Sequence, residues 1–160
     1  MRHPTRTRLL LLLLLIGIVA TPLIPEASAQ ADRVDWAARI AEVDRLLARG
    51  ETTAVTAAWR EAYVAAHASR SWPGMLAVGD AAVRAGRATG TPEVFEPRAR
   101  RAYLTALLRA RRQGSRDGVL AAADAFGRLG DRDAERVARS EAATLAIRAE
   151  HEVRRRAGAL

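Results

Sequence analysis

The sequence predicts an all-α protein, and three observations lead to this prediction. Apolar residues recur at intervals of three and four, which is the spacing of one face of an amphipathic helix. Strict alternation of apolar and polar residues is absent and β-branched residues are sparse, so no segment has the pattern of a strand. Glycines follow the helical segments at recurring positions, where a left-handed backbone conformation ends a helix without a steric penalty.

Residues 1–29 have the layout of a secretory signal peptide. Three arginines precede an apolar run at residues 9–20, and residues 27–29 (Ala-Ser-Ala) match the small-x-small pattern of a cleavage site. A helix over this run would be about 18 Å long, whereas the hydrocarbon core of a membrane is about 30 Å thick, so a retained membrane anchor is the weaker alternative. We expect cleavage after Ala29 and export of residues 30–160 to the periplasm or the extracellular space through the Sec route.

Six helices are predicted after this segment. They span residues of about 33–49, 53–70, 74–86, 97–112, 118–129 and 132–156. In the first, third and fifth helices, apolar residues share one face: Trp36, Ile40, Val43 and Leu47; Met75, Val78 and Ala82; Val119, Ala123 and Phe126. The second, fourth and sixth carry rows of alanine at every fourth position: Ala54, Ala58, Ala62 and Ala66; Ala102, Ala106 and Ala110; Ala134, Ala138, Ala142 and Ala146. Such rows let two helix axes approach closely.

A repeated Asp-x5-Gly pattern divides the six helices into three pairs. It runs from Asp44 to Gly50, from Asp80 to Gly86 and from Asp124 to Gly130, at spacings of 36 and 44 residues. We expect each glycine to end the first helix of a pair, so that the chain bends at residues 50, 86 and 130. The middle unit is four residues longer, and we assign the extra residues to its loop.

Two further expectations concern the middle unit and the repeated aspartates. Residues 91–95 are predicted to form a short turn, with Pro97 interrupting or starting the fourth helix. Equivalent aspartates of stacked units would lie about 10 Å apart, which is too far to share one metal ion. We therefore expect the aspartates to stabilise turns or to pair with arginines.

The helix–glycine–helix organisation resembles tetratricopeptide repeats. Small residues expected seven before the turn glycine are present at Gly79 and Ala123, and the alanine expected twelve after it is present at Ala62 and Ala142. The resemblance implies three antiparallel hairpins stacked as a short solenoid, with a general helical bundle as the alternative. It also implies an adaptor that binds peptides or proteins.

The composition excludes several kinds of chemistry. The chain contains no cysteine, so disulfides, thiolate metal sites and cysteine nucleophiles are excluded. Of its three histidines, His67 and His151 lie outside the signal segment, and neither belongs to a metal-binding pattern. The serines lie in no nucleophile-elbow pattern and no phosphate-binding loop is present. We expect a non-catalytic protein with no metal or cofactor; an enzyme of unrecognised type is the minor alternative.

An arginine-rich helix face is the strongest candidate binding site. The chain carries 26 basic residues, all of them arginine, against 18 acidic residues. At 100° per residue, five arginines of the predicted fourth helix and its exit fall within an arc of about 80°. These are Arg98, Arg101, Arg109, Arg112 and Arg116. The face is interpreted either as an anion-binding surface or as a solvated face neutralised by acidic residues of neighbouring helices.

These observations predict an exported interaction module of the cell envelope. Its partner is expected to be a protein or peptide, and the alternative is an anionic membrane surface or cell-wall polymer bound by the arginine face. Nucleic acid is not expected as a partner, because an exported protein rarely meets it and no nucleic-acid-binding motif is present. An array of three hairpins leaves a solvent-exposed face at its end, where a second copy of the chain could pack to form a homo-oligomer. Trp59, Tyr63 and Trp72 are expected to pack in the core or between units rather than to form a ligand cage.

Overall fold

The structure is a computed structural model that describes residues 26–158, and this part of the chain is all-α. It contains six helices and no strand among the described residues, which confirms the predicted class. The helices are α2 (Glu26–Ala48), α3 (Thr52–Ala68), α4 (Trp72–Thr89), α5 (Pro92–Arg112), α6 (Arg116–Leu129) and α7 (Arg132–Ala157). The apolar run at residues 9–20 lies outside the described residues. Within residues 26–158, no helix combines the length and the hydropathy needed to cross a membrane.

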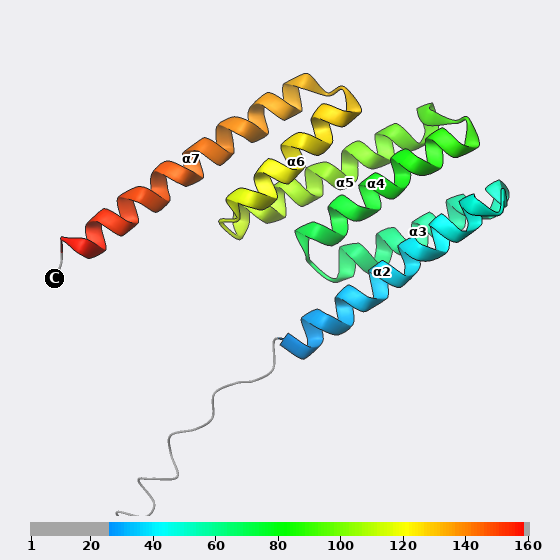
Figure 1. Cartoon of the computed structure of the whole chain (residues 1–160), viewed down its shortest axis with the longest axis horizontal. Helices are drawn as coiled ribbons and strands as arrows, with labels where there is room; N and C mark the ends of the chain where they lie inside the picture. The colour runs from blue at the N-terminus through cyan, green and yellow to red at the C-terminus, as the bar shows by residue number, and fades with distance from the viewer. Residues whose placement is uncertain (1–25, 159–160) are drawn as a thin grey trace, which may run out of the picture.

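Helices that follow one another in the chain lie side by side (Figure 1). The most extensive contacts join α4 with α5, α2 with α3, and α6 with α7. Helix α4 is central, because it also packs against α2, α3 and α6. The C-terminal part of α7 extends past the end of α6 (Figure 1).

Alanine fills most of the core. Fourteen of the 26 buried apolar residues are alanines, so the helices meet through short side chains and their axes approach closely. The predicted alanine rows contribute directly: Ala62, Ala66, Ala102, Ala106, Ala110, Ala138 and Ala142 are all buried. The largest fully buried side chains, Tyr103, Phe126 and Met75, belong to α4, α5 and α6. The core is therefore concentrated around these three central helices.

The turn glycines differ from the prediction at one position. Gly50, Gly90 and Gly130 have φ values of 71°, 68° and 81°, so the left-handed turns recur every 40 residues. The predicted bend at Gly86 is wrong, because α4 continues through it to Thr89. A side chain at position 86 would lie only 3.0 Å from Cβ of Phe95, so glycine lets the start of α5 approach α4 there. The four extra residues of the middle unit thus lengthen α4 rather than its loop.

The start of α5 also differs from the prediction. The helix begins at Pro92, and Pro97 lies inside it rather than interrupting or starting it. Proline suits the first helical position, where the backbone N–H has no partner within the helix. Pro97 removes one helical hydrogen bond, which leaves the carbonyl of Glu93 without its donor. Both residues are exposed, so water can bind that carbonyl and the helix continues.

Tryptophans of one helix pack on glycines of a later helix. A Cβ atom added at Gly74 of α4 would lie 3.1 Å from the Trp36 indole of α2, and one at Gly118 of α6 would lie 2.8 Å from the Trp72 indole of α4. The same kind of contact therefore joins α2 to α4 and α4 to α6. Trp72 packs between helices, as the sequence predicts.

The repeated aspartates pair with arginines, which confirms that prediction. Asp44 accepts two hydrogen bonds of 3.0 Å from Arg84, and the carboxylate of Asp80 lies 3.1 Å from Arg128. Each arginine stands four residues after the aspartate of its own helix, so the same pair joins α2 to α4 and α4 to α6. Asp124, on the last of these helices, pairs instead with Arg139 of α7 at 2.9 Å.

Enlarging Gly118 tests the tryptophan–glycine contact. In a Gly118→Ala variant the new Cβ would lie 2.7 Å from Cβ of Ala110 and 2.8 Å from the Trp72 ring. We expect the free energy of unfolding to fall by about 1–2 kcal/mol, because the cost of overpacking exceeds the gain in helix propensity. Urea denaturation followed by circular dichroism measures the change.

Gly158→Ala is the matched control. The nearest atom to a Cβ at that position is the carbonyl oxygen of Arg154, at 3.6 Å. Its unfolding free energy should stay within about 0.5 kcal/mol of the original, as for other substitutions away from packed contacts. Equal effects of the two substitutions would contradict the proposed role of Gly118.

Candidate functional site

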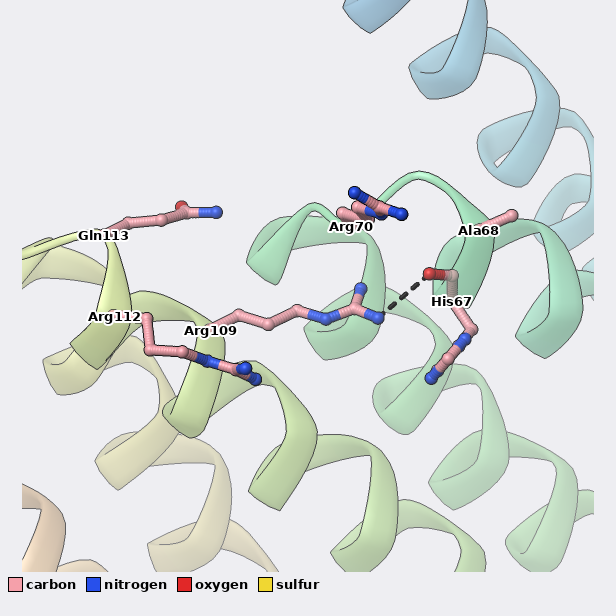
Figure 2. A pocket seen from close by; sticks show the side chains of 6 residues that line it. All are labelled: His67, Ala68, Arg70, Arg109, Arg112 and Gln113. Atoms are coloured by element: carbon pink, nitrogen blue, oxygen red, sulfur yellow. Dashed lines mark hydrogen bonds between the residues drawn. The ribbon is translucent and has the colours of Figure 1, made fainter.

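Two hollows lie on the face that α3 and α5 share. The first has a volume of about 630 Å³ and is called the His67 hollow; it is lined by His67, Ala68, Arg70, Arg109, Arg112 and Gln113 (Figure 2). The second has a volume of about 260 Å³ and is called the Trp59 hollow; it is lined by Thr56, Trp59, Arg60, Tyr63, Arg98 and Arg101. The rings of Tyr63 and His67 stack with centroids 6.0 Å apart, so the hollows adjoin. Together they form the α3–α5 face.

Arg109 anchors the end of α3 to α5. Its side chain is buried, and its guanidinium group donates to the carbonyl oxygen of His67 at 2.9 Å (Figure 2). It also donates to the carbonyl oxygens of Ala66 (3.2 Å) and Ser71 (3.3 Å). The last carbonyls of a helix have no partner within the helix and form its negative end, so a buried cation stabilises this position. Burial lowers the pKa of the Arg109 guanidinium, and the charges of Arg112 and Arg70 lower it further. Arginine nevertheless stays protonated in proteins.

Arg70 occupies a backbone conformation that favours glycine. Its φ is 54°, and it is the one non-glycine residue with positive φ in the described chain. The turn before α6 has Gly114 at the equivalent place, with φ 65°, and both residues directly precede a serine that caps the next helix. The left-handed conformation costs a residue with a Cβ atom about 1 kcal/mol. The chain thus carries a strained arginine at the edge of the His67 hollow.

Aromatic rings hold Arg98 in the Trp59 hollow. Its guanidinium carbon lies 5.5 Å from the centroid of the Trp59 ring and 4.9 Å from that of Phe95. Trp59 is itself fixed, because its indole N–H donates to the carbonyl of Val78 at 2.9 Å. Nη1 of Arg98 is buried and has no hydrogen-bond partner among the described residues. A buried donor without a partner costs free energy.

The structure brings together four of the five predicted arginines. Arg98 and Arg101 line the Trp59 hollow, and Arg109 and Arg112 line the His67 hollow. Arg116 is exposed at the start of α6 and lines neither. The face is not a continuous exposed stripe, because Arg109 is buried and Arg98 is half-buried.

The contribution of α3 and its exit could not be predicted from the sequence. Arg60 lines the Trp59 hollow, and Arg70 lines the His67 hollow. The periodicity of one helix shows which of its own residues share a face, but not which residues of another helix lie opposite. Arg70 stands out only by its positive φ in the turn after α3, and the sequence does not reveal that backbone conformation.

All charged residues that line the two hollows are basic. Apart from His67, these are arginines: Arg60, Arg70, Arg98, Arg101, Arg109 and Arg112. Among the described residues, none of the six forms an ion pair with a carboxylate. The sequence left two interpretations open, and in the described part of the chain no acidic neighbour pairs with these arginines.

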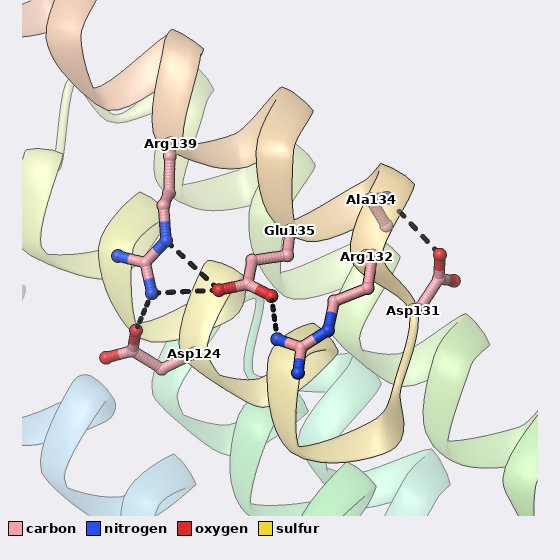
Figure 3. A network of polar contacts seen from close by, with 6 residues as sticks. All are labelled: Asp124, Asp131, Arg132, Ala134, Glu135 and Arg139. Atoms are coloured by element: carbon pink, nitrogen blue, oxygen red, sulfur yellow. Dashed lines mark hydrogen bonds and ion pairs between the residues drawn. The ribbon is translucent and has the colours of Figure 1, made fainter.

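Several arginines of α7 are compensated by carboxylates. In Figure 3, Glu135 of α7 accepts from Arg132 at 2.9 Å and from Arg139 at 3.1 Å, and Arg139 also reaches Asp124. The hydrogen bonds from the two arginines lower the pKa of Glu135. Asp131 caps α7 by accepting from the N–H of Ala134, and its pKa is lowered by its hydrogen bond with Arg100. The arginines of the α3–α5 face therefore differ from Arg132 and Arg139 in having no acidic partner among the described residues.

The comparisons with known proteins give no relative. No family model matches the chain, and no curated protein or solved structure matches it. Within residues 26–158, no group of three or more histidine, aspartate or glutamate side chains is placed to hold a metal ion. The chemistry offered by the α3–α5 face is hydrogen bonding and charge attraction to an anion, from guanidinium groups next to aromatic rings.

Replacing Arg70 with glycine measures its backbone strain. We expect Arg70→Gly to raise the unfolding free energy by about 1 kcal/mol, because glycine adopts the left-handed conformation without a Cβ clash. The reciprocal change, Gly114→Arg, should lower it by a similar amount. Urea denaturation of both variants provides the comparison, and a loss of stability in Arg70→Gly would show that the strain is absent.

Proposed function

We propose that residues 30–160 form an exported, non-catalytic interaction module that binds an acidic segment of a partner protein on the α3–α5 face. In this proposal the helices form three tetratricopeptide-like hairpins, α2–α3, α4–α5 and α6–α7. The left-handed turns at Gly50, Gly90 and Gly130, spaced by 40 residues, support the repeat. So do the tryptophan–glycine contacts and aspartate–arginine pairs that recur between α2, α4 and α6.

One observation carries the binding proposal: six arginines line two adjoining hollows without a carboxylate partner among the described residues. Positive charges gathered without compensation repel one another and attract an anion. Guanidinium groups bind carboxylates with paired hydrogen bonds, and rings beside them favour a ligand that also has apolar parts. An acidic stretch of polypeptide offers both.

An anionic membrane surface or cell-wall polymer is the second candidate. It is favoured by the exposure of Arg101, Arg112 and Arg116, which a flat charged surface could reach. It is disfavoured by the burial of Arg109 and the half-burial of Arg98, because a flat surface cannot reach buried guanidinium groups. We therefore place the protein ligand first.

Neutralising exposed arginines of the α3–α5 face tests the binding proposal. The variant Arg60→Gln, Arg101→Gln, Arg112→Gln should bind a synthetic polyglutamate peptide about tenfold more weakly at low salt, because it loses charge at both hollows. Isothermal titration calorimetry gives the affinity. Thermal unfolding should be nearly unchanged, since none of the three side chains forms an ion pair with a described carboxylate.

The matched control removes three exposed arginines elsewhere: Arg87→Gln, Arg148→Gln, Arg154→Gln. Its net charge equals that of the first variant. Its affinity for the same peptide should stay within about twofold of the original, because distant exposed charges are screened by salt. Equal losses in the two variants would mean that only net charge matters. Binding to phosphatidylglycerol vesicles without binding of any acidic peptide would favour the second candidate instead.

The export proposal has its own test. When the full chain is produced in a bacterial host, the protein recovered from the periplasm or medium should begin at Gln30, as N-terminal sequencing would show. Enlarging the cleavage site with Ala27→Phe and Ala29→Phe should leave the longer precursor in the membrane fraction. Recovery of the full chain with Met1 from the cytosol would contradict export.

A further inference from the structure

We propose that the α3–α5 face recognises an extended peptide with two separate acidic groups about 16 Å apart and an uncharged centre. This inference rests on the proposed function and specifies its ligand. It follows from the placement of the arginines, which lie in two groups rather than in one continuous row.

Helix α5 sets the separation of the two groups. Arg98 and Arg101 line the Trp59 hollow, and Arg109 and Arg112 line the His67 hollow eleven residues further along. At 1.5 Å per residue, that separation is about 16 Å. Helix α3 and its exit add Arg60 to the first group and Arg70 to the second, so each group holds three arginines.

The surface between the groups carries no charge of its own. Residues 102–108 of α5 are all uncharged, and the adjoining rings of Tyr63 and His67 lie between the hollows. Glu61 of α3 is directed to α2, where it accepts from Arg39 at 2.6 Å. A ligand with charge along its whole length would place anionic groups against this region without a partner, which costs desolvation energy.

An extended polypeptide fits this arrangement. It advances about 3.3 Å per residue, so about five residues cover the distance between the groups. Acidic side chains at both ends would meet the guanidinium groups, and small uncharged residues would cover the centre. A chain of this width can enter the Trp59 hollow beside Arg98, whereas a bilayer surface cannot.

The strain at Arg70 points to the same site. The equivalent turn before α6 has glycine, so an arginine at this position is not needed to make the turn. Strained conformations are retained where the side chain serves a purpose other than stability. At the edge of the His67 hollow, that purpose is a third positive charge next to Arg109 and Arg112.

Two peptides of identical composition test the spacing. The split peptide is Glu-Glu-Ser-Ala-Ser-Glu-Glu, and the contiguous peptide is Ser-Ala-Ser-Glu-Glu-Glu-Glu. Both are acetylated and amidated to remove terminal charges. We expect calorimetry at fixed ionic strength to show the split peptide binding about tenfold more tightly, because only it reaches both groups of arginines at once.

Two variants locate the effect on the protein. Arg60→Gln with Arg101→Gln removes charge from the first group and should abolish the preference for the split peptide. Arg70→Gly should weaken binding of the split peptide about fivefold while the fold stays as stable as before or becomes more stable, a combination that a purely structural role of Arg70 would not give. Arg87→Gln with Arg148→Gln is the control of equal charge and should keep the full preference.

Each contrary result has a distinct meaning. Equal affinity for the two peptides, with binding still dependent on Arg60, Arg101 and Arg112, would overturn the two-group inference and leave the proposed function standing. Failure of every acidic peptide to bind would overturn both. Tighter binding of inorganic polyphosphate or phosphatidylglycerol vesicles than of the split peptide would overturn the assignment of a peptide ligand.

Discussion

Close packing of helices through alanine and glycine is the constraint on which the rest of the structure depends. A tryptophan ring lies on a glycine where α2 meets α4 and again where α4 meets α6, and Tyr103 lies on Gly79 within the central pair. A larger residue at any of these glycines would push the helices apart. The aspartate–arginine pairs cross the same two helix contacts, so their geometry depends on the same spacing. These pairs are exposed and each adds little by itself, whereas the packing beneath them fixes where each helix lies.

The same packing determines which charges are compensated. Where α2, α4, α6 and α7 meet, arginines pair with aspartates of a neighbouring helix. Between α3 and α5 the space is filled instead by long side chains: Trp59 and Arg98 at one end, and Arg109 at the other. The charge of Arg109 binds the carbonyls that end α3. Arg70 and Arg112 lie near it, and none of these arginines has an acidic partner among the described residues. The fold therefore tolerates a repulsive cluster, and an anionic ligand would relieve that repulsion.

The sequence predicted what is local and missed what depends on contacts between helices. The all-α class and the burial of the alanine rows follow from periodicity, which each helix displays by itself. The bend assigned to Gly86 was wrong because Gly86 and Gly90 are both suited to end a helix, and the choice depends on how closely Phe95 approaches Gly86. Pro97 was misassigned because the cost of its missing hydrogen bond is small where the carbonyl is exposed. For the arginine face, projection onto one helix grouped the residues of α5, but it could not reveal that Arg109 is buried or that α3 and the turn after it add two further arginines.

The central claim is that the arginines of the α3–α5 face bind an anion while the paired arginines of other faces do not. Resolved arginine Nε–Hε signals in a nuclear magnetic resonance titration with an acidic peptide test this claim directly, since each side chain reports its own environment. The account predicts shifts for Arg70, Arg98, Arg101 and Arg112, and unchanged signals for Arg84 and the other ion-paired arginines. Shifts spread equally over both sets, or confined to the paired set, would contradict it.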